Sequence, residues 1–175
     1  MAQRADILDL ARFVHSPGEG RRVDVDVTPG RLSYGEQDYA VAGDSVTARV
    51  DISRTSTGYS LRLRFDAPVV GPCVRCLEDA EMRVDVDARE VDQPGASEEE
   101  GLHSPYVDGD ELDAGAWAHD ALALAMPVQF LCRPDCAGLC AVCGASLNDA
   151  DTAEHRHGDE AEANPFAKLR EIRFD

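Results

Sequence analysis

Six cysteines and two histidines are the side chains of this sequence best suited to holding a metal ion. They are Cys73, Cys76, Cys132, Cys136, Cys140, Cys143, His155 and His157. Thiolate and imidazole are ligands that zinc prefers, and a C-x2-C turn places two thiolates on one side of a tight loop. These ligands are enough for two four-coordinate sites, so the sequence predicts that the protein binds Zn²⁺, as one or two ions.

The ligands can be divided between two sites in more than one way. In the favoured arrangement the first site consists of Cys73, Cys76, Cys132 and Cys136. The second site then consists of Cys140, Cys143, His155 and His157. A rival arrangement joins the two C-x2-C units, as in a zinc ribbon, and leaves the other two cysteines with the histidines. An arrangement with only one metal site is a further alternative.

Two glycines suit the C-terminal C-x2-C unit to a knuckle. Gly144 follows Cys143 directly, where the chain must turn away from the metal, and Gly138 permits a reversal between Cys136 and Cys140. The glycines thus lie where the backbone must turn if the neighbouring cysteines bind a metal.

Other cysteine chemistry agrees less well with the sequence. A redox-active C-x-x-C pair begins a helix, whereas Cys76 leads into a strand pattern. A catalytic zinc needs an open coordination position and a general base such as Glu154 or Asp159, and complete ligand sets make closed structural sites the simpler account. A disulfide framework needs an oxidising compartment, and the charged first residues do not resemble a signal peptide. We therefore expect a cytoplasmic protein without enzymatic activity.

The chain is strongly acidic. Acidic residues outnumber basic ones 34 to 17, which gives a formal net charge of −17. This charge opposes nonspecific attraction to a nucleic-acid backbone or an anionic membrane and favours a basic partner. Because no apolar run approaches the roughly 18 residues of a membrane span, we expect no membrane association. No glycine-rich phosphate loop or catalytic triad pattern indicates a small-molecule substrate.

Alternating apolar and polar residues predict that residues 1–92 are mainly β. Period-two stretches occupy residues 23–27, 39–41, 46–52, 61–65 and 82–88, and turn residues occupy 42–44, 56–58 and 68–72. Residues 1–20 are predicted to be a short helical or irregular lead-in. If the strands around residues 61–65 and 82–88 pair, Arg62 and Arg64 would face Asp85 and Asp87.

The remaining segments are predicted as an acidic loop, a helix and a metal-binding end. The loop covers residues 93–111 and the helix residues 112–127, with Asp113 as its N-cap. Its predicted buried residues are Trp117, Ala121, Leu124 and Ala125. Residues 128–175 form the metal-binding and C-terminal segment, with a short helix from Asn164. We expect a single α+β domain over residues 1–175, a β-rich antiparallel sheet or partial barrel with one main helix and a C-terminal zinc-knuckle segment.

The cysteine motifs and their surroundings resemble a known family. The residues concerned are Cys73-Val-Arg-Cys76-Leu, an acidic spacer, Leu-Ala-Leu-Ala-Met-Pro-Val, the cluster from Leu131 to Gly144 and a terminal Asn-Pro-Phe-Ala-Lys-Leu. Together they look like the YceD family, also called DUF177, in order along nearly the whole chain and most weakly near the N-terminus. The resemblance implies a bacterial, cytoplasmic, non-enzymatic factor needed for accumulation of large-subunit ribosomal RNA. It also implies that the gene commonly lies beside that of a small zinc-binding ribosomal protein of that subunit.

The implied link to ribosomal RNA and the net charge of −17 lead to two hypotheses for the partner. The acidic surface would bind a basic ribosomal protein of the large-subunit precursor, or a local patch of arginines would contact a feature of the precursor RNA. The candidate RNA contacts are Arg49, Arg62, Arg64 and Arg75. Without an RNA partner, these arginines would simply form part of the solvent-exposed face of an amphipathic sheet. A zinc-binding module for another basic or nucleic-acid partner is the alternative function, and a thiol or zinc enzyme is less favoured.

Overall fold

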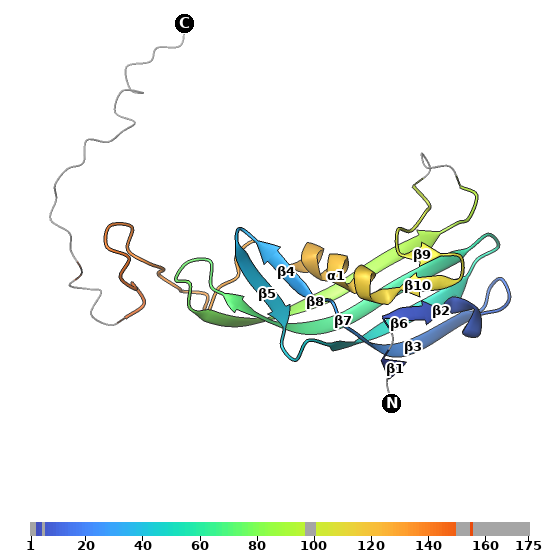
Figure 1. Ribbon diagram of the computed structural model, residues 1–175, viewed down its shortest axis with the longest axis horizontal. Helices are drawn as coiled ribbons and strands as arrows, with labels where there is room; N and C mark the ends of the chain where they lie inside the picture. Colours follow the sequence, from blue (N-terminus) through green and yellow to red (C-terminus); the bar gives the residue numbers. More distant parts are fainter. Residues whose placement is uncertain (1–2, 5, 97–100, 150–154, 156–175) are drawn as a thin grey trace, which may run out of the picture. The chain divides into compact units, whose positions relative to one another are not determined.

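The structure is a computed structural model that describes residues 3–4, 6–96, 101–149 and 155. The chain divides into two compact units, Met1–Cys136 and Ala137–Asp175, which are described separately. Figure 1 shows the first unit as a β-sheet structure with one α-helix. The strands are β1 (Gln3–Arg4), β2 (Ile7–Asp9), β3 (Gly20–Val27), β4 (Arg31–Tyr34), β5 (Gln37–Val41), β6 (Val46–Arg54), β7 (Tyr59–Pro72), β8 (Asp79–Asp92), β9 (Val107–Asp108) and β10 (Glu111–Asp113). The helices are the 3-10 helix η1 (Leu10–Arg12) and α1 (Ala114–Ala125).

The main sheet has seven strands built around β7. Along one path the order is β1-β3-β6-β7-β5-β4, and β8 pairs with β7 as well. A smaller sheet has the order β2-β10-β9. All pairs are antiparallel except β1 with β3. The predicted class, a β-rich antiparallel α+β fold with one main helix, is confirmed.

Some element bounds differ from the prediction. Residues 1–20 include strands β1 and β2, and the described part of the predicted loop 93–111 includes β9 and the start of β10. Residues 68–72 continue β7 and are not a turn. Pro68 is tolerated there because it lies between the β7 residues that pair with β6 and those that pair with β5, where a missing N–H is least costly.

Helix α1 packs on the inner face of the main sheet, and its start follows from one side chain. The Asp113 carboxylate accepts a hydrogen bond from the N–H of Ala116 at 2.8 Å, so the predicted N-cap is confirmed. Trp117 and Ala121 are buried as predicted, whereas Ala125 is only half-buried. Leu124 is 89% exposed, so its predicted burial is wrong. It shares the helical face of Trp117 but lies two turns further on, where the described residues leave this face open.

No helix in the described ranges combines the length and apolar character that a membrane crossing requires. Helix α1 has 12 residues.

Tyr39 connects the sheet to the segment that follows α1. Its buried ring meets the Phe130 ring edge-on, with 5.0 Å between ring centroids, and its hydroxyl donates to the carbonyl of Pro72 at 3.2 Å. The ring also lies against Gly71, where an added Cβ would come within 2.3 Å of Tyr39 Cδ1. Gly71 therefore leaves the space that Tyr39 occupies.

We predict that Gly71→Ala destabilises the protein. The new methyl group would force the buried Tyr39 ring to move, at a cost of about 1–3 kcal/mol in the free energy of unfolding. Gly20→Ala is the matched control, since the nearest atoms to its Cβ lie 3.7 Å away and a strand alanine is favoured over glycine by about 0.5–1 kcal/mol. Urea denaturation measures both. Equal midpoints for Gly71→Ala and the unmodified protein would contradict the close approach.

Candidate metal centre

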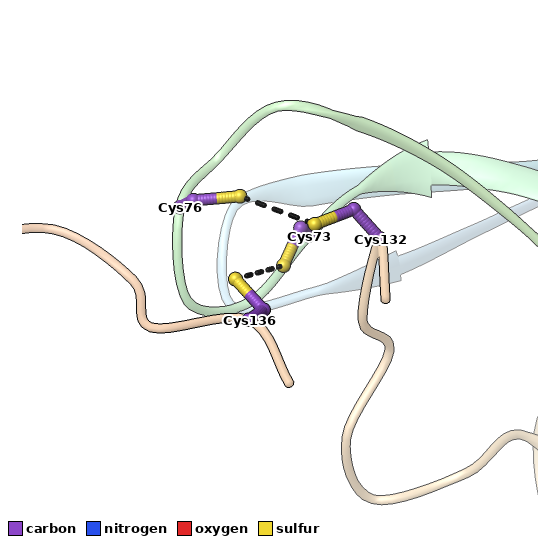
Figure 2. Close-up of side chains that lie close together, drawn as sticks. All are labelled: Cys73, Cys76, Cys132 and Cys136. Carbon is purple, nitrogen blue, oxygen red and sulfur yellow. Dashed lines mark hydrogen bonds between the residues drawn. The ribbon is translucent and has the colours of Figure 1, made fainter. Parts of the chain in front are cut away.

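The first unit brings four thiols together at one end of the main sheet (Figure 2). The sulfur atoms of Cys73, Cys76, Cys132 and Cys136 all lie within 4.8 Å of one another. The Sγ–Sγ distance is 3.8 Å from Cys73 to Cys136 and 3.6 Å from Cys76 to Cys132. A tetrahedral zinc with Zn–S bonds of about 2.3 Å requires sulfur atoms about 3.8 Å apart, whereas a disulfide requires about 2.05 Å. The donor set therefore fits one tetrahedral zinc ion.

The turn between β7 and β8 positions Cys73 and Cys76. The backbone N–H of Arg75 donates to Cys73 Sγ at 3.5 Å, and the N–H of Leu77 donates to the Cys73 carbonyl at 2.9 Å. The N–H of Cys73 closes the turn onto the carbonyl of Glu78 at 2.8 Å. These bonds hold both thiols on one side of the turn.

Two hydrogen bonds attach the segment that carries Cys132 and Cys136 to this turn. The N–H of Val74 donates to the Phe130 carbonyl at 2.9 Å, and Arg75 Nη1 donates to the Cys136 carbonyl at 2.9 Å. The side chain of Arg75, a candidate RNA contact, thus has a partner within the cysteine site. Phe130 was not predicted from the sequence, because both its ring contact with Tyr39 and the hydrogen bond to its carbonyl join segments that are distant in the sequence.

The second unit brings together Cys140, Cys143 and His155, whose ligand atoms also lie within 4.8 Å of one another. The distance from Cys143 Sγ to His155 Nε2 is 3.4 Å. His157, the fourth predicted ligand, lies outside the described residues, as do Glu154 and Asp159. The described part of this group offers three ligands.

The two C-x2-C turns share the same hydrogen-bond pattern. In the second turn the N–H of Val142 donates to Cys140 Sγ at 3.4 Å and the N–H of Gly144 donates to the Cys140 carbonyl at 2.8 Å. The residue after the second cysteine has a left-handed backbone in both, with φ +73° at Gly144 and +62° at Leu77. Alignment of the two C-x2-C units would have placed Leu77 against Gly144 and predicted this conformation. Both turns have the knuckle geometry that zinc sites use.

Backbone donors lower the pKa of one thiol in each turn. Burial acts to raise the pKa of Cys73, but donation from the N–H groups of Cys76 and Arg75 outweighs it and lowers this pKa to about 6. At Cys140 the N–H of Cys143 is the main cause of a pKa that is also lowered to about 6. A lowered pKa favours the thiolate, which is the form that binds a metal.

The structure groups the predicted ligands as in the favoured arrangement. The thiols of the β7–β8 turn meet Cys132 and Cys136, and the C-terminal C-x2-C unit meets His155. The pairing of the two C-x2-C units in the rival arrangement does not occur among the described ligand groups. Zinc itself stays a prediction.

The other candidate RNA contacts lie on the outer face of the main sheet, and each guanidinium donates to a carboxylate. The pairs are Arg49 with Asp24, Arg62 with Asp87 and Arg64 with Asp51. Burial acts to raise the pKa of Asp51, but hydrogen bonds from Arg22 and Arg64 outweigh it and lower this pKa. These arginines are therefore held within a network of opposite charges.

The predicted facing of arginines and acids between β7 and β8 is only partly right. Arg62 binds Asp87 as predicted, although the residue directly opposite Arg62 is Arg89. Asp85 lies opposite Asp66 and not opposite an arginine. Arg64 does lie directly opposite Asp87, so the register of the two strands matches one of the predicted pairs and leaves Asp85 without an arginine opposite it.

We predict that Gly144→Val weakens metal binding by the second group. Nothing lies within 4 Å of a Cβ at Gly144, so the change acts through the left-handed backbone, at a cost of about 1–2 kcal/mol and roughly tenfold in metal affinity. Gly144→Asn is the matched control, because asparagine tolerates this conformation. Competition of the zinc-loaded protein with a chelator measures the difference. Equal zinc release from both variants would rule out a role for the left-handed turn.

Comparison with known proteins identifies the family. The model of the YceD family, described as large ribosomal RNA subunit accumulation protein YceD, matches residues 61–173. This range contains all but the first two residues of β7, the whole of β8 and α1, and all the predicted metal ligands. No solved structure matches the chain.

Several relatives match as well. An uncharacterized protein of Mycobacterium tuberculosis is 31% identical over 155 residues, which cover 86% of this chain and 73% of that protein. An uncharacterized protein of Mycobacterium leprae is 36% identical over 86 residues, or 46% of this chain and 39% of that protein. A Zea mays protein named large ribosomal RNA subunit accumulation protein YCED homolog 1, chloroplastic, is 32% identical over 78 residues, or 45% of this chain and 22% of that protein. The family match across both cysteine groups and the long mycobacterial alignment show that this chain belongs to the YceD family.

Proposed function

We propose that this protein is a non-enzymatic, zinc-binding factor of ribosome biogenesis that supports the accumulation of large-subunit ribosomal RNA in the bacterial cytoplasm. The observation that carries the proposal is the family match over residues 61–173, because the description of the family names this process. The Zea mays relative has the same description in its name. The matched range includes both cysteine groups, so the metal centres belong to the part of the chain that the family shares.

The first zinc ion has a structural role in this proposal. Four thiolates would complete its tetrahedral shell and leave no open position for a substrate or an activated water molecule. The ion would join the β7–β8 turn to the segment after α1, so that metal binding stabilises this end of the first unit. The protein thus acts through the surface that it presents to a partner.

In this proposal Cys140, Cys143 and His155, whose ligand atoms lie within 4.8 Å of one another, would hold the second zinc ion. His157 is the proposed fourth ligand, on the basis of its place two residues after His155. This site shapes the C-terminal unit, which has the same knuckle turn as the first site.

The proposed partner is a basic ribosomal protein of the large-subunit precursor. The net charge of −17 favours such a partner and opposes extended contact with RNA. An RNA phosphate would also have to compete with Asp24, Asp51 and Asp87 for the guanidinium groups on the outer face of the sheet. These observations favour protein over RNA as the direct contact.

We predict two zinc ions per chain, which native mass spectrometry measures. The double variant Cys140→Ser/Cys143→Ser removes both thiolates of the second group and is expected to retain one ion. Val142→Ser, at an exposed residue between the two cysteines, is the matched control and is expected to keep both ions. Loss of all zinc from the double variant would mean that the two groups share a single site.

We predict that deletion of the gene lowers the ratio of large-subunit to small-subunit ribosomal RNA. Expression of the wild-type protein from a plasmid is expected to restore the ratio, and Cys73→Ser/Cys76→Ser is expected to fail because the buried thiols lose their metal. Quantification of both RNAs from growing cells measures the effect. An unchanged ratio after deletion would refute the proposed function.

A further inference from the structure

Strand β8 pairs with another strand on one side only. Its 14 residues pair without interruption with β7, and no described residue pairs with its other edge. In an antiparallel strand about half of the backbone N–H and C=O groups point away from the partner. Such an open edge is a template for a further strand.

A groove of about 510 Å³ follows this edge, and α1 forms its other wall. Consecutive residues 85–90 of β8 line one side. Trp117, Ala121, Leu124 and Ala125 of α1 line the other side. Leu124 is 89% exposed, which is unusual for a leucine on the helical face that packs on the sheet. The groove thus combines unpaired backbone groups with an apolar wall.

Two devices that often protect an edge strand, a proline and a bulge, are absent from the centre of β8. Residues 85–90 contain no proline, and the continuous register excludes a bulge. The charged side chains of Asp85, Asp87 and Arg89 point to the outer face, whereas Val86 and Ala88 point to the inner face. These charged side chains favour an incoming strand that carries the opposite charge beside them.

Asp85 favours a basic neighbour. It lies directly opposite Asp66 on β7, and neither carboxylate forms an ion pair with a described residue. Like charges opposite each other destabilise a sheet. A cationic side chain on an incoming strand would lie beside Asp85 from the open side and offset this repulsion.

We propose that β8 and α1 form a docking groove in which an extended segment of a basic partner protein adds to β8 as a strand. The segment alternates apolar residues, which pack against Leu124, with basic residues, which lie beside Asp85. The proposal rests on the proposed function in that the partner is a basic ribosomal protein. A second copy of this chain would bring another charge of −17 to the same surface, and RNA phosphates would meet the carboxylates of the groove.

The first test uses a short synthetic peptide that alternates lysine and valine. Hydrogen exchange is expected to show slower exchange of backbone amides in residues 85–90 when the peptide is added. A peptide with glutamate in place of lysine is expected to leave these amides unchanged. Protection of another surface, or equal protection by both peptides, would overturn the proposal.

Two variants of the groove test the contacts. Leu124→Lys and Asp85→Lys change exposed side chains and are each expected to weaken peptide binding about tenfold. Val128→Lys and Glu111→Lys are the matched controls, because they also replace an exposed aliphatic and an exposed acidic side chain by lysine, at residues outside the groove. Equal affinity of all four variants would overturn the proposal, as would a dimer in sedimentation analysis that only Leu124→Lys and Asp85→Lys dissociate.

A test in cells separates this proposal from the proposed function. Leu124→Lys is expected to fail to restore the ribosomal RNA ratio of a deletion strain, whereas Val128→Lys restores it. If both variants restore the ratio, the docking groove is wrong and the role in RNA accumulation stands. If deletion itself leaves the ratio unchanged, the proposed function fails, and the peptide experiments still decide whether the groove binds a basic strand.

Discussion

Four thiols within 4.8 Å of one another cannot all be charged without a cation between them, and the end of the main sheet depends on this constraint. The N–H of Glu78 acts to lower the pKa of Cys76, but burial and the neighbouring thiols raise it to about 12. Without a metal the site therefore supports few thiolates, whereas a divalent ion would let all four ionise. Metal binding and the packing of the β7–β8 turn against the segment after α1 therefore depend on each other, because the four sulfur atoms can be charged together only around a cation.

Strand β7 connects the cysteine site to the rest of the main sheet. This strand pairs with β6 near its start, with β5 near its end and with β8 along its length, so it connects every part of the main sheet. The cysteine turn lies at the end of the β7–β8 hairpin, and Tyr39 and Phe130 hold the segment after α1 beside it. A change at the metal site thus acts on both the hairpin and the helix segment.

The sequence was most informative where the chemistry is local. Cysteine spacing favoured the cysteine groups that the structure brings together, alternation predicted the main strands, and Asp113 predicted the start of α1. The errors concern relations between distant segments. Pro68 resembles a turn residue until the change of partner along β7 is known, and Leu124 has the spacing of a buried residue although its end of the helix is uncovered. No local pattern contains this information.

The strand register shows how the metal site affects the rest of the surface. Because the cysteine turn ends where Pro72 pairs with Asp79, the length of that turn fixes the pairing along the whole hairpin. A register displaced by two residues would keep the same faces and place Asp85 opposite Arg64, the match that the charges alone favour. The knuckle instead places Asp85 opposite Asp66. The geometry required to hold the metal therefore leaves uncompensated negative charge on β8, whose second edge pairs with no described residue.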